Sequence, residues 1–149
     1  MTWRPSVTVA AVMERGGRFL FVEERSSGRL VLNQPAGHLE PGESLIQACR
    51  REVLEETAHH FEPRALIGVY RWHYAPKDVT FLRLCFSGDV GDADPARKLD
   101  KEIVRLHWLT PAELEARKAD HRSPLVQQCV ADFLAGRRFP LEMFSQEFA

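Results

Sequence analysis

The sequence predicts a single α/β domain in which a mixed β-sheet packs between helices. Short apolar segments rich in β-branched residues alternate irregularly with segments of helical periodicity, which favours this fold class. Several of the connections between apolar segments are short enough to form hairpins. The chain has 149 residues, the length of one ordinary domain, and it contains no linker or internal repeat. We therefore expect one domain over residues 1–149.

The first part of the chain combines apolar strands with a glycine-containing loop and a helix. The strands expected here are residues 7–13, 19–22 and 31–32. Gly16 and Gly17 lie between the first two strands and predict a hairpin turn. Pro35 and Gly37 favour an irregular loop, which leads into a helix from about Ser44 to Thr57.

Three more strands are expected in the second part of the chain. They are residues 65–74, 80–87 and 103–109. Residues 75–78 contain a proline and an aspartate and predict a hairpin between the first two of these strands. Residues 91–101 are polar and acidic, which predicts a loop.

Two helices and an apolar tail complete the predicted fold. Thr110-Pro111-Ala112-Glu113 is a capping box with proline at the first helical position, so a short helix should begin there. Ser123 and Pro124 resemble a second helix start, with Ser123 as the cap and the helix ending near Gly136. Residues 139–144 are too apolar for a free end, and we expect them to pack on the domain.

Charge and composition exclude several classes of function. The net charge is −1 and the pI is about 6.6, so no basic field is available to hold nucleic acid. We expect no membrane span and no secretory leader, because no apolar stretch is long enough. Cys49, Cys85 and Cys129 each occur in an apolar context without a Cys-x-x-Cys pair. Reduced core thiols in a cytoplasmic protein are the expectation.

The helix over residues 44–57 carries a cluster of carboxylates. At about 100° per residue, Cys49 and Val53 lie on the core-facing stripe. Glu52 and Glu56 then lie one turn apart on the neighbouring flank, with Glu55 beside them. Neighbouring ionised glutamates repel one another, so a bound cation is the simplest reason to gather them. Hard oxygen ligands suit Mg²⁺, with Mn²⁺ as a substitute.

The same segment resembles the Nudix box. The box reads glycine, five residues, glutamate, seven residues, Arg-Glu, an aliphatic residue, any residue, and Glu-Glu. In this sequence these positions are Gly37, Glu43, Arg51, Glu52, Val53, Glu55 and Glu56. A glutamate-rich helix alone is more often a solvated face, but these combined offsets make a chance match improbable. The sequence thus resembles the Nudix hydrolases, and the resemblance implies an α/β/α sandwich and cleavage of phosphoric anhydrides.

The resemblance also implies roles for individual residues. The carbonyl of Gly37 would join the metal shell, and an ion pair between Glu43 and Arg51 would hold the loop. The expected metal ligands are Gly37, Glu52, Glu55 and Glu56. For Glu55 the choice between third ligand and general base stays open. The candidate catalytic residues are Arg51, Glu52, Glu55 and Glu102, the last because many Nudix enzymes place an extra carboxylate at the start of that strand.

The motif departs from the family at its end. Ala58 stands where the box has a glycine, and His59 stands where it has an aliphatic residue. A glycine normally ends a helix because it adopts a left-handed backbone without strain. These positions affect the exit of the helix and not the charge of the metal site, so activity is still expected.

Longer stretches resemble one bacterial phosphatase of the Nudix family. They are residues 33–40, 122–126 and 140–143. The resemblance implies hydrolysis of nucleoside tri- and diphosphates, of thiamine pyrophosphate and of its pyrimidine pyrophosphate precursor. The alternatives are a pyrophosphatase for ADP-ribose or another nucleotide sugar, a Nudix module that senses nucleotides without turnover, and a purely structural domain. The expected partner is a small nucleotide or pyrophosphate, bound by a monomer or a homodimer.

Several side chains outside the box are candidates for substrate contacts. They are His38, Arg25, Arg29 and Trp72, to which Arg71 and Arg83 can be added as phosphate-binding cations. An aromatic ring such as that of Trp72 can stack on a heterocycle, although packing in a hairpin explains it equally well. For each arginine a solvated surface position is the alternative.

Overall fold

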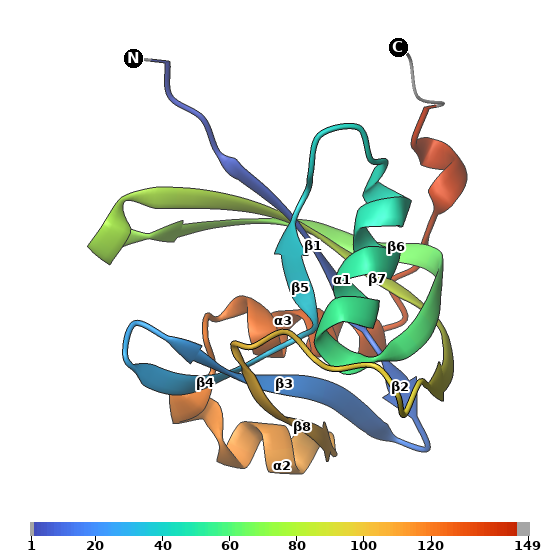
Figure 1. Cartoon of the computed structure of the whole chain (residues 1–149). Helices are drawn as coiled ribbons and strands as arrows, with labels where there is room; N and C mark the ends of the chain where they lie inside the picture. The colour runs from blue at the N-terminus through green and yellow to red at the C-terminus, as the bar shows by residue number, and fades with distance from the viewer. Residues whose placement is uncertain (1, 146–149) are drawn as a thin grey trace.

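The computed structural model describes residues 2–145 and contains two β-sheets and three α-helices within that range (Figure 1). The first sheet has the strand order β5 (Ala36–His38), β1 (Ser6–Val12), β7 (Val79–Ala93), β6 (His59–Tyr74), β9 (Phe139–Pro140). The second sheet contains β2 (Glu14–Arg15), β3 (Arg18–Ser26), β4 (Arg29–Asn33) and β8 (Ile103–Leu109). The helices are α1 (Leu45–Thr57), α2 (Pro111–Ala116) and α3 (Leu125–Leu134).

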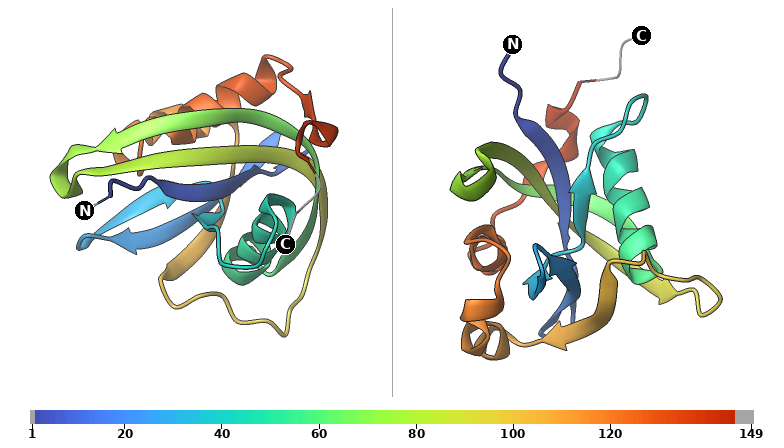
Figure 2. Two further views of the ribbon diagram at one scale, coloured as in Figure 1. Left: turned by 90° about the horizontal axis from the view of Figure 1, so that it is seen from above. Right: turned by 60° about the vertical axis from the view of Figure 1, so that its left-hand side comes forward.

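The first sheet is mixed and lies between helices, as predicted. β1 runs parallel to β7, whereas β5, β6 and β9 pair with their neighbours in the antiparallel direction. Helix α1 covers one face of this sheet and α3 covers the other (Figure 2). Alternate residues of β1 accordingly enter two separate cores. Val9 and Ala11 pack with α1, whereas Ala10 and Val12 pack with α3 and the second sheet.

Helix α1 is fixed at both ends. Ser44 accepts a hydrogen bond from the backbone N–H of Gln47, and the Gln47 side chain accepts one from the N–H of Ser44. The helix ends at Ala58, which takes the left-handed conformation with φ of 58° while its N–H still donates to the carbonyl of Leu54. An L-residue with a Cβ is strained there by about 1–2 kcal/mol, and this position is the one where the Nudix box has glycine.

The structure corrects several element bounds. Residues 36–38, expected to belong to an irregular loop, form β5 and pair with β1. The strand expected at residues 19–22 continues to Ser26 as β3, so Glu23 and Glu24 belong to it. β6 and β7 are longer than predicted, and β7 takes in the start of the loop expected at residues 91–101. Long antiparallel pairing outweighs the weak strand propensity of these polar residues.

The three cysteines and the tail lie as expected. Cys49, Cys85 and Cys129 are free and buried. Leu141 and Phe144 pack against the core on the α1 side of the first sheet. The prediction of Ser123 as the cap of α3 was wrong, because the helix begins one residue later and its N-cap is Pro124, although the Ser123 hydroxyl accepts a hydrogen bond from the N–H of Leu125 at 3.1 Å. Within the part of the chain that the structure describes, no helix has the length and apolarity needed to cross a membrane.

Candidate active site

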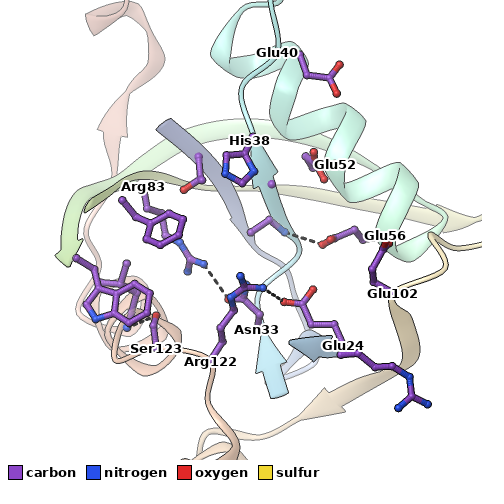
Figure 3. A pocket seen from close by; sticks show the side chains of 17 residues that line it. Glu24, Asn33, His38, Glu40, Glu52, Glu56, Arg83, Glu102, Arg122 and Ser123 are labelled. Atoms are coloured by element: carbon purple, nitrogen blue, oxygen red, sulfur yellow. Dashed lines mark hydrogen bonds and ion pairs between the residues drawn. The ribbon is translucent and has the colours of Figure 1, made fainter. Parts of the chain in front are cut away.

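A cavity of about 520 Å³ opens between α1, the edge of β5 and the start of α3 (Figure 3). One end is lined by carboxylates and the other by aromatic and polar side chains. The carboxylates are Glu24, Glu40, Glu52, Glu56 and Glu102. The other end contains Thr8, Asn33, Trp72, Phe81, Arg83, Ser123 and Leu125. The cavity therefore has an acidic half that can bind a cation and an aromatic half that can bind an organic group.

Gly37 and Glu52 contact each other so closely that a larger residue at position 37 would displace the Glu52 carboxylate. A Cβ added at Gly37 would lie 2.0 Å from the carboxyl carbon of Glu52. From the sequence we also expect Gly37 to let the backbone approach a ligand closely and to adopt a positive φ. The positive φ was wrong, since Gly37 has an ordinary strand conformation, and the approach to a ligand stays a prediction. The Gly37 backbone and the Glu52 carboxylate thus form one edge of the acidic half.

Arg51 joins the loop before α1 to the helix through several acceptors. Its guanidinium contacts both carboxylate oxygens of Glu43, at 2.9 and 2.7 Å, which is the ion pair predicted from the motif. It also donates to the carbonyl of His38 at 2.9 Å, to Glu52 at 2.7 Å and to Glu55 at 3.0 Å. The Arg51 hydrogen bond lowers the pKa of Glu43, so that carboxylate stays ionised.

The three motif glutamates do not share one environment. Glu52 and Glu56 both line the cavity. Glu55 does not line the cavity; it pairs with Arg51 at 3.0 Å and borders a second groove. A role of Glu55 as metal ligand or base would therefore require its side chain to turn toward the cavity, whereas Glu52 lines the cavity while it accepts from the same Arg51 nitrogen.

Burial raises the pKa values of the two glutamates in the cavity. The pKa of Glu56 rises from 4.5 to about 9, first because the side chain is buried and then because the charges of Glu24, Glu52 and Asp100 lie nearby. The N–H of Ala36 donates to Glu56 at 2.9 Å and opposes this shift. The pKa of Glu52 is also raised by burial, partly offset by Arg51. In the metal-free protein the acidic half therefore holds a proton near neutral pH.

The donor set of the acidic half fits a hard divalent cation. Among residues 2–145, no three carboxylate, imidazole or thiol groups converge as a ready-made cage. Mg²⁺ does not require such a cage, because it keeps several waters and is held by one or two carboxylates together with substrate phosphates. Glu52, Glu56 and the Gly37 backbone supply oxygen ligands of this kind. The raised pKa of Glu56 marks a carboxyl group whose charge has no partner, which a cation would provide.

The opposite half contains an aromatic pair above a buried arginine. Trp72 and Phe81 are stacked with ring centroids 5.6 Å apart. Arg83 is 6% exposed and donates to the side-chain oxygens of Asn33 at 2.9 Å and Gln34 at 2.8 Å. The alternative of a solvated surface position for Arg83 was wrong, because its side chain is buried. The strand alternation placed its side chain away from Leu84, but α3 covers that face of the sheet.

The other substrate candidates divide between the cavity and the surface. Arg25, His38 and Glu102 line the cavity, and the backbone N–H of Arg25 donates to the Glu102 carbonyl at 3.2 Å. Arg29 is exposed, donates to the carbonyl of Ala119 and does not line the cavity. Arg71 is exposed as well and lies outside the cavity.

Three charged residues of the cavity, Glu24, Glu40 and Arg122, were not among the candidates from the sequence. Glu24 is 7% exposed, and its Oε1 accepts a hydrogen bond from Nη1 of Arg122 at 2.6 Å. Glu23 and Glu24 are adjacent acids that follow an apolar strand, and this pattern could have indicated a site residue. It was missed because the strand was predicted to end at residue 22. Arg122 gave no such signal, because its position depends on a contact with β4 that pattern analysis does not predict.

Comparison with known proteins identifies the family. The NUDIX domain family matches residues 2–129. The chain belongs to the Nudix family. Phosphatase NudJ of Escherichia coli K12 is 38% identical over 141 residues, which cover 95% of this chain and 91% of that protein. Phosphatase NudJ of Shigella sonnei is equally similar, with the same identity and coverage.

Solved structures agree with this assignment. A NUDIX hydrolase from Nitrosomonas europaea is 53% identical, covers 97% of this chain and 98% of its own, and superposes with a TM-score of 0.93. The E. coli ORF135 protein, at 23% identity and a TM-score of 0.71, shares the fold. Nudix enzymes generally use a divalent metal and act on small nucleotide substrates. The chain is thus a Nudix hydrolase that acts on phosphoric anhydride bonds.

Proposed function

We propose that this Nudix hydrolase is a Mg²⁺-dependent phosphatase for nucleoside tri- and diphosphates and for pyrimidine pyrophosphates related to thiamine. The single observation that carries the proposal is a cavity whose acidic half lies beside an aromatic half. A diphosphate ester has the matching division into an anionic group and an organic group. Similarity to phosphatase NudJ over nearly the whole chain supports a phosphatase in preference to a nucleotide-sugar pyrophosphatase.

In this proposal Gly37, Glu52 and Glu56 hold the metal. When bound, the divalent ion neutralises charge on the phosphoryl oxygens and makes a coordinated water more acidic. The protein holds the two glutamates on one flank of α1, anchored by the core contacts of Cys49 and Val53. Arg51 holds the end of β5 next to Gly37 through the carbonyl of His38 and pairs with Glu43 in the loop that follows.

A general base is needed to take the proton of the attacking water. The new bond joins the water oxygen to phosphorus, the anhydride P–O bond breaks, and the leaving phosphate or nucleotide carries the electron pair away. Glu102 is a candidate base because it lines the cavity without an Arg51 contact. Glu55 is the second candidate, and its use requires its side chain to turn toward the cavity.

Phosphate release with Mg²⁺ tests this function directly. We expect Glu52→Gln and Glu56→Gln each to lower turnover on the order of 100-fold while the circular dichroism spectrum is unchanged. A substrate panel containing nucleoside di- and triphosphates, pyrimidine pyrophosphates and ADP-ribose identifies the class of substrate. Wild-type rates in either variant refute the assigned ligands. Nucleotide binding without turnover in the wild type would instead identify a sensing module. The buried free thiols support a cytoplasmic location, which we include in the proposal.

A further inference from the structure

Arg122 brings a positive charge to the acidic half of the cavity from a distant part of the chain. Its Nη1 donates to Oε1 of Glu24, a residue 98 positions earlier in the sequence. A guanidinium has five N–H donors. Within residues 2–145, the contact with Glu24 is the only hydrogen bond of this side chain. The Arg122 side chain is 40% exposed and lines the cavity, so its other donors are accessible to a ligand.

The backbone around Arg122 is firmly held. The N–H of Arg122 donates to the carbonyl of Leu32 in β4 at 2.9 Å. His121 forms a parallel β-bridge with the same residue, Leu32. On the other side, the Ser123 hydroxyl accepts a hydrogen bond from the N–H of Leu125, the first residue of α3. The position of the Arg122 Cα is therefore set by the fold, and Glu24 determines where the guanidinium lies.

The ion pair is not explained by its contribution to stability. Glu24 is buried next to the acidic cluster, and its charge is one of those that raise the pKa of Glu56. Burying a carboxylate near others is costly, and an arginine that is partly exposed repays little of that cost. An apolar residue in place of Glu24 would avoid the repulsion. A role in ligand binding explains the ion pair of Arg122 with Glu24 better than a role in stability.

Arg122 lies across the cavity from α1 (Figure 3). Glu52 and Glu56 extend from α1 on one side, and Glu24 and Arg122 extend from β3 and the loop before α3 on the other. A diphosphate bound to the α1 side would direct its remaining anionic oxygens at this opposite wall. A planar guanidinium with free donors matches phosphoryl oxygens in both charge and geometry.

We propose that Arg122 binds a phosphoryl group of the substrate and that Glu24 is the positioning residue that holds its guanidinium in the cavity. This inference rests on the proposed function in that it assigns a diphosphate to the same cavity. It adds a phosphate-binding residue that lies outside the Nudix box and a carboxylate whose role is not metal ligation.

Equilibrium binding measurements can distinguish phosphoryl binding by Arg122 and its positioning by Glu24 from metal ligation. The first probe is inorganic imidodiphosphate, a diphosphate whose bridging oxygen is replaced by NH, titrated in the presence of Mg²⁺. The second probe is Mn²⁺ alone. We expect Arg122→Ala to weaken imidodiphosphate binding 10- to 100-fold and Arg122→Lys to weaken it less, with Mn²⁺ affinity unchanged in both. Because neither titration needs turnover, a failure of the proposed hydrolysis would not be mistaken for a failure of this inference.

A double-mutant cycle tests the positioning role of Glu24. Glu24→Gln should weaken imidodiphosphate binding about 3- to 10-fold in the wild-type background and have no further effect in the Arg122→Ala background. The matched control is Arg105→Ala, which removes an exposed arginine 3.6 Å from the neighbouring Glu23 and outside the cavity, and it should bind like the wild type. Unchanged binding in Arg122→Ala overturns the proposal. Loss of Mn²⁺ affinity in Glu24→Gln also overturns it and makes Glu24 a metal ligand.

Discussion

Replacing Glu56 with glutamine should stabilise the metal-free protein while it removes activity. The pKa of Glu56 is about 9 in the folded state, compared with 4.5 as the ordinary value. At pH 7 the folded protein therefore holds this proton and the unfolded chain does not. With about 1.4 kcal/mol per pKa unit, the 2.5 units between pH 7 and the unfolded value correspond to about 3 kcal/mol of lost stability. Glutamine keeps the shape and the acceptor for the Ala36 N–H but has no proton to bind.

The sign of the pH dependence follows from the same shift. Between pH 4.5 and 9 the folded state binds more protons at Glu56 than the unfolded state, so the stability of the wild type falls as pH rises. Relative to Glu56→Gln, the wild type should lose about 1.4 kcal/mol per pH unit between pH 6 and pH 8. Added Mg²⁺ should restore stability to the wild type, more strongly at pH 8 than at pH 6, because the cation displaces the proton.

Urea denaturation in EDTA at several pH values measures this difference. The matched control is Glu142→Gln, which removes an exposed carboxylate far from the cavity and should follow the wild type at every pH. A constant difference between the wild type and Glu56→Gln from pH 6 to pH 8 would show that this carboxyl group is not the one that holds the proton.

Substitutions at three further positions test the structure that surrounds the site. Gly37→Ala places a methyl group against Glu52, so we expect Mn²⁺ affinity, measured by titration calorimetry, to fall on the order of 10- to 100-fold in a folded protein. Ala58→Val puts a β-branched residue at φ 58° and should cost at least about 2 kcal/mol in urea denaturation, whereas Ala58→Gly should change stability by less than about 1 kcal/mol. Glu43→Gln weakens the bidentate contact with Arg51 and should lower stability by about 1–2 kcal/mol, and equal unfolding midpoints would contradict a structural role for the pair.

The acidic helix was predictable because its information is local. The spacing of Glu52 and Glu56 follows from helical periodicity, and the core stripe that orients them follows from Cys49 and Val53. The ion pair of Glu43 with Arg51 joins residues eight positions apart and could be inferred from motif spacing. What periodicity could not show is that Glu55, although it lies beside Glu52 on α1, borders a different groove and does not line the cavity.

The rest of the cavity depends on contacts between distant segments. Arg83 appeared to be a surface residue because strand alternation gives the face of a residue but not what covers that face. Its partners Asn33 and Gln34 lie 50 and 49 positions away. Arg122 reaches the cavity because its backbone is fixed to β4. In the same way, β5 forms from a segment with proline and glycine because the edge of β1 offers unpaired backbone groups to it.

The parallel pairing of β1 with β7 also determines when this protein can fold during synthesis. Ser6–Val12 leaves the ribosome early, but its parallel partner at Phe81–Ser87 is translated more than 70 residues later. Until then an apolar, β-branched segment is exposed on the nascent chain with one of its two edges unpaired. Slow translation over the intervening segment would prolong that exposure.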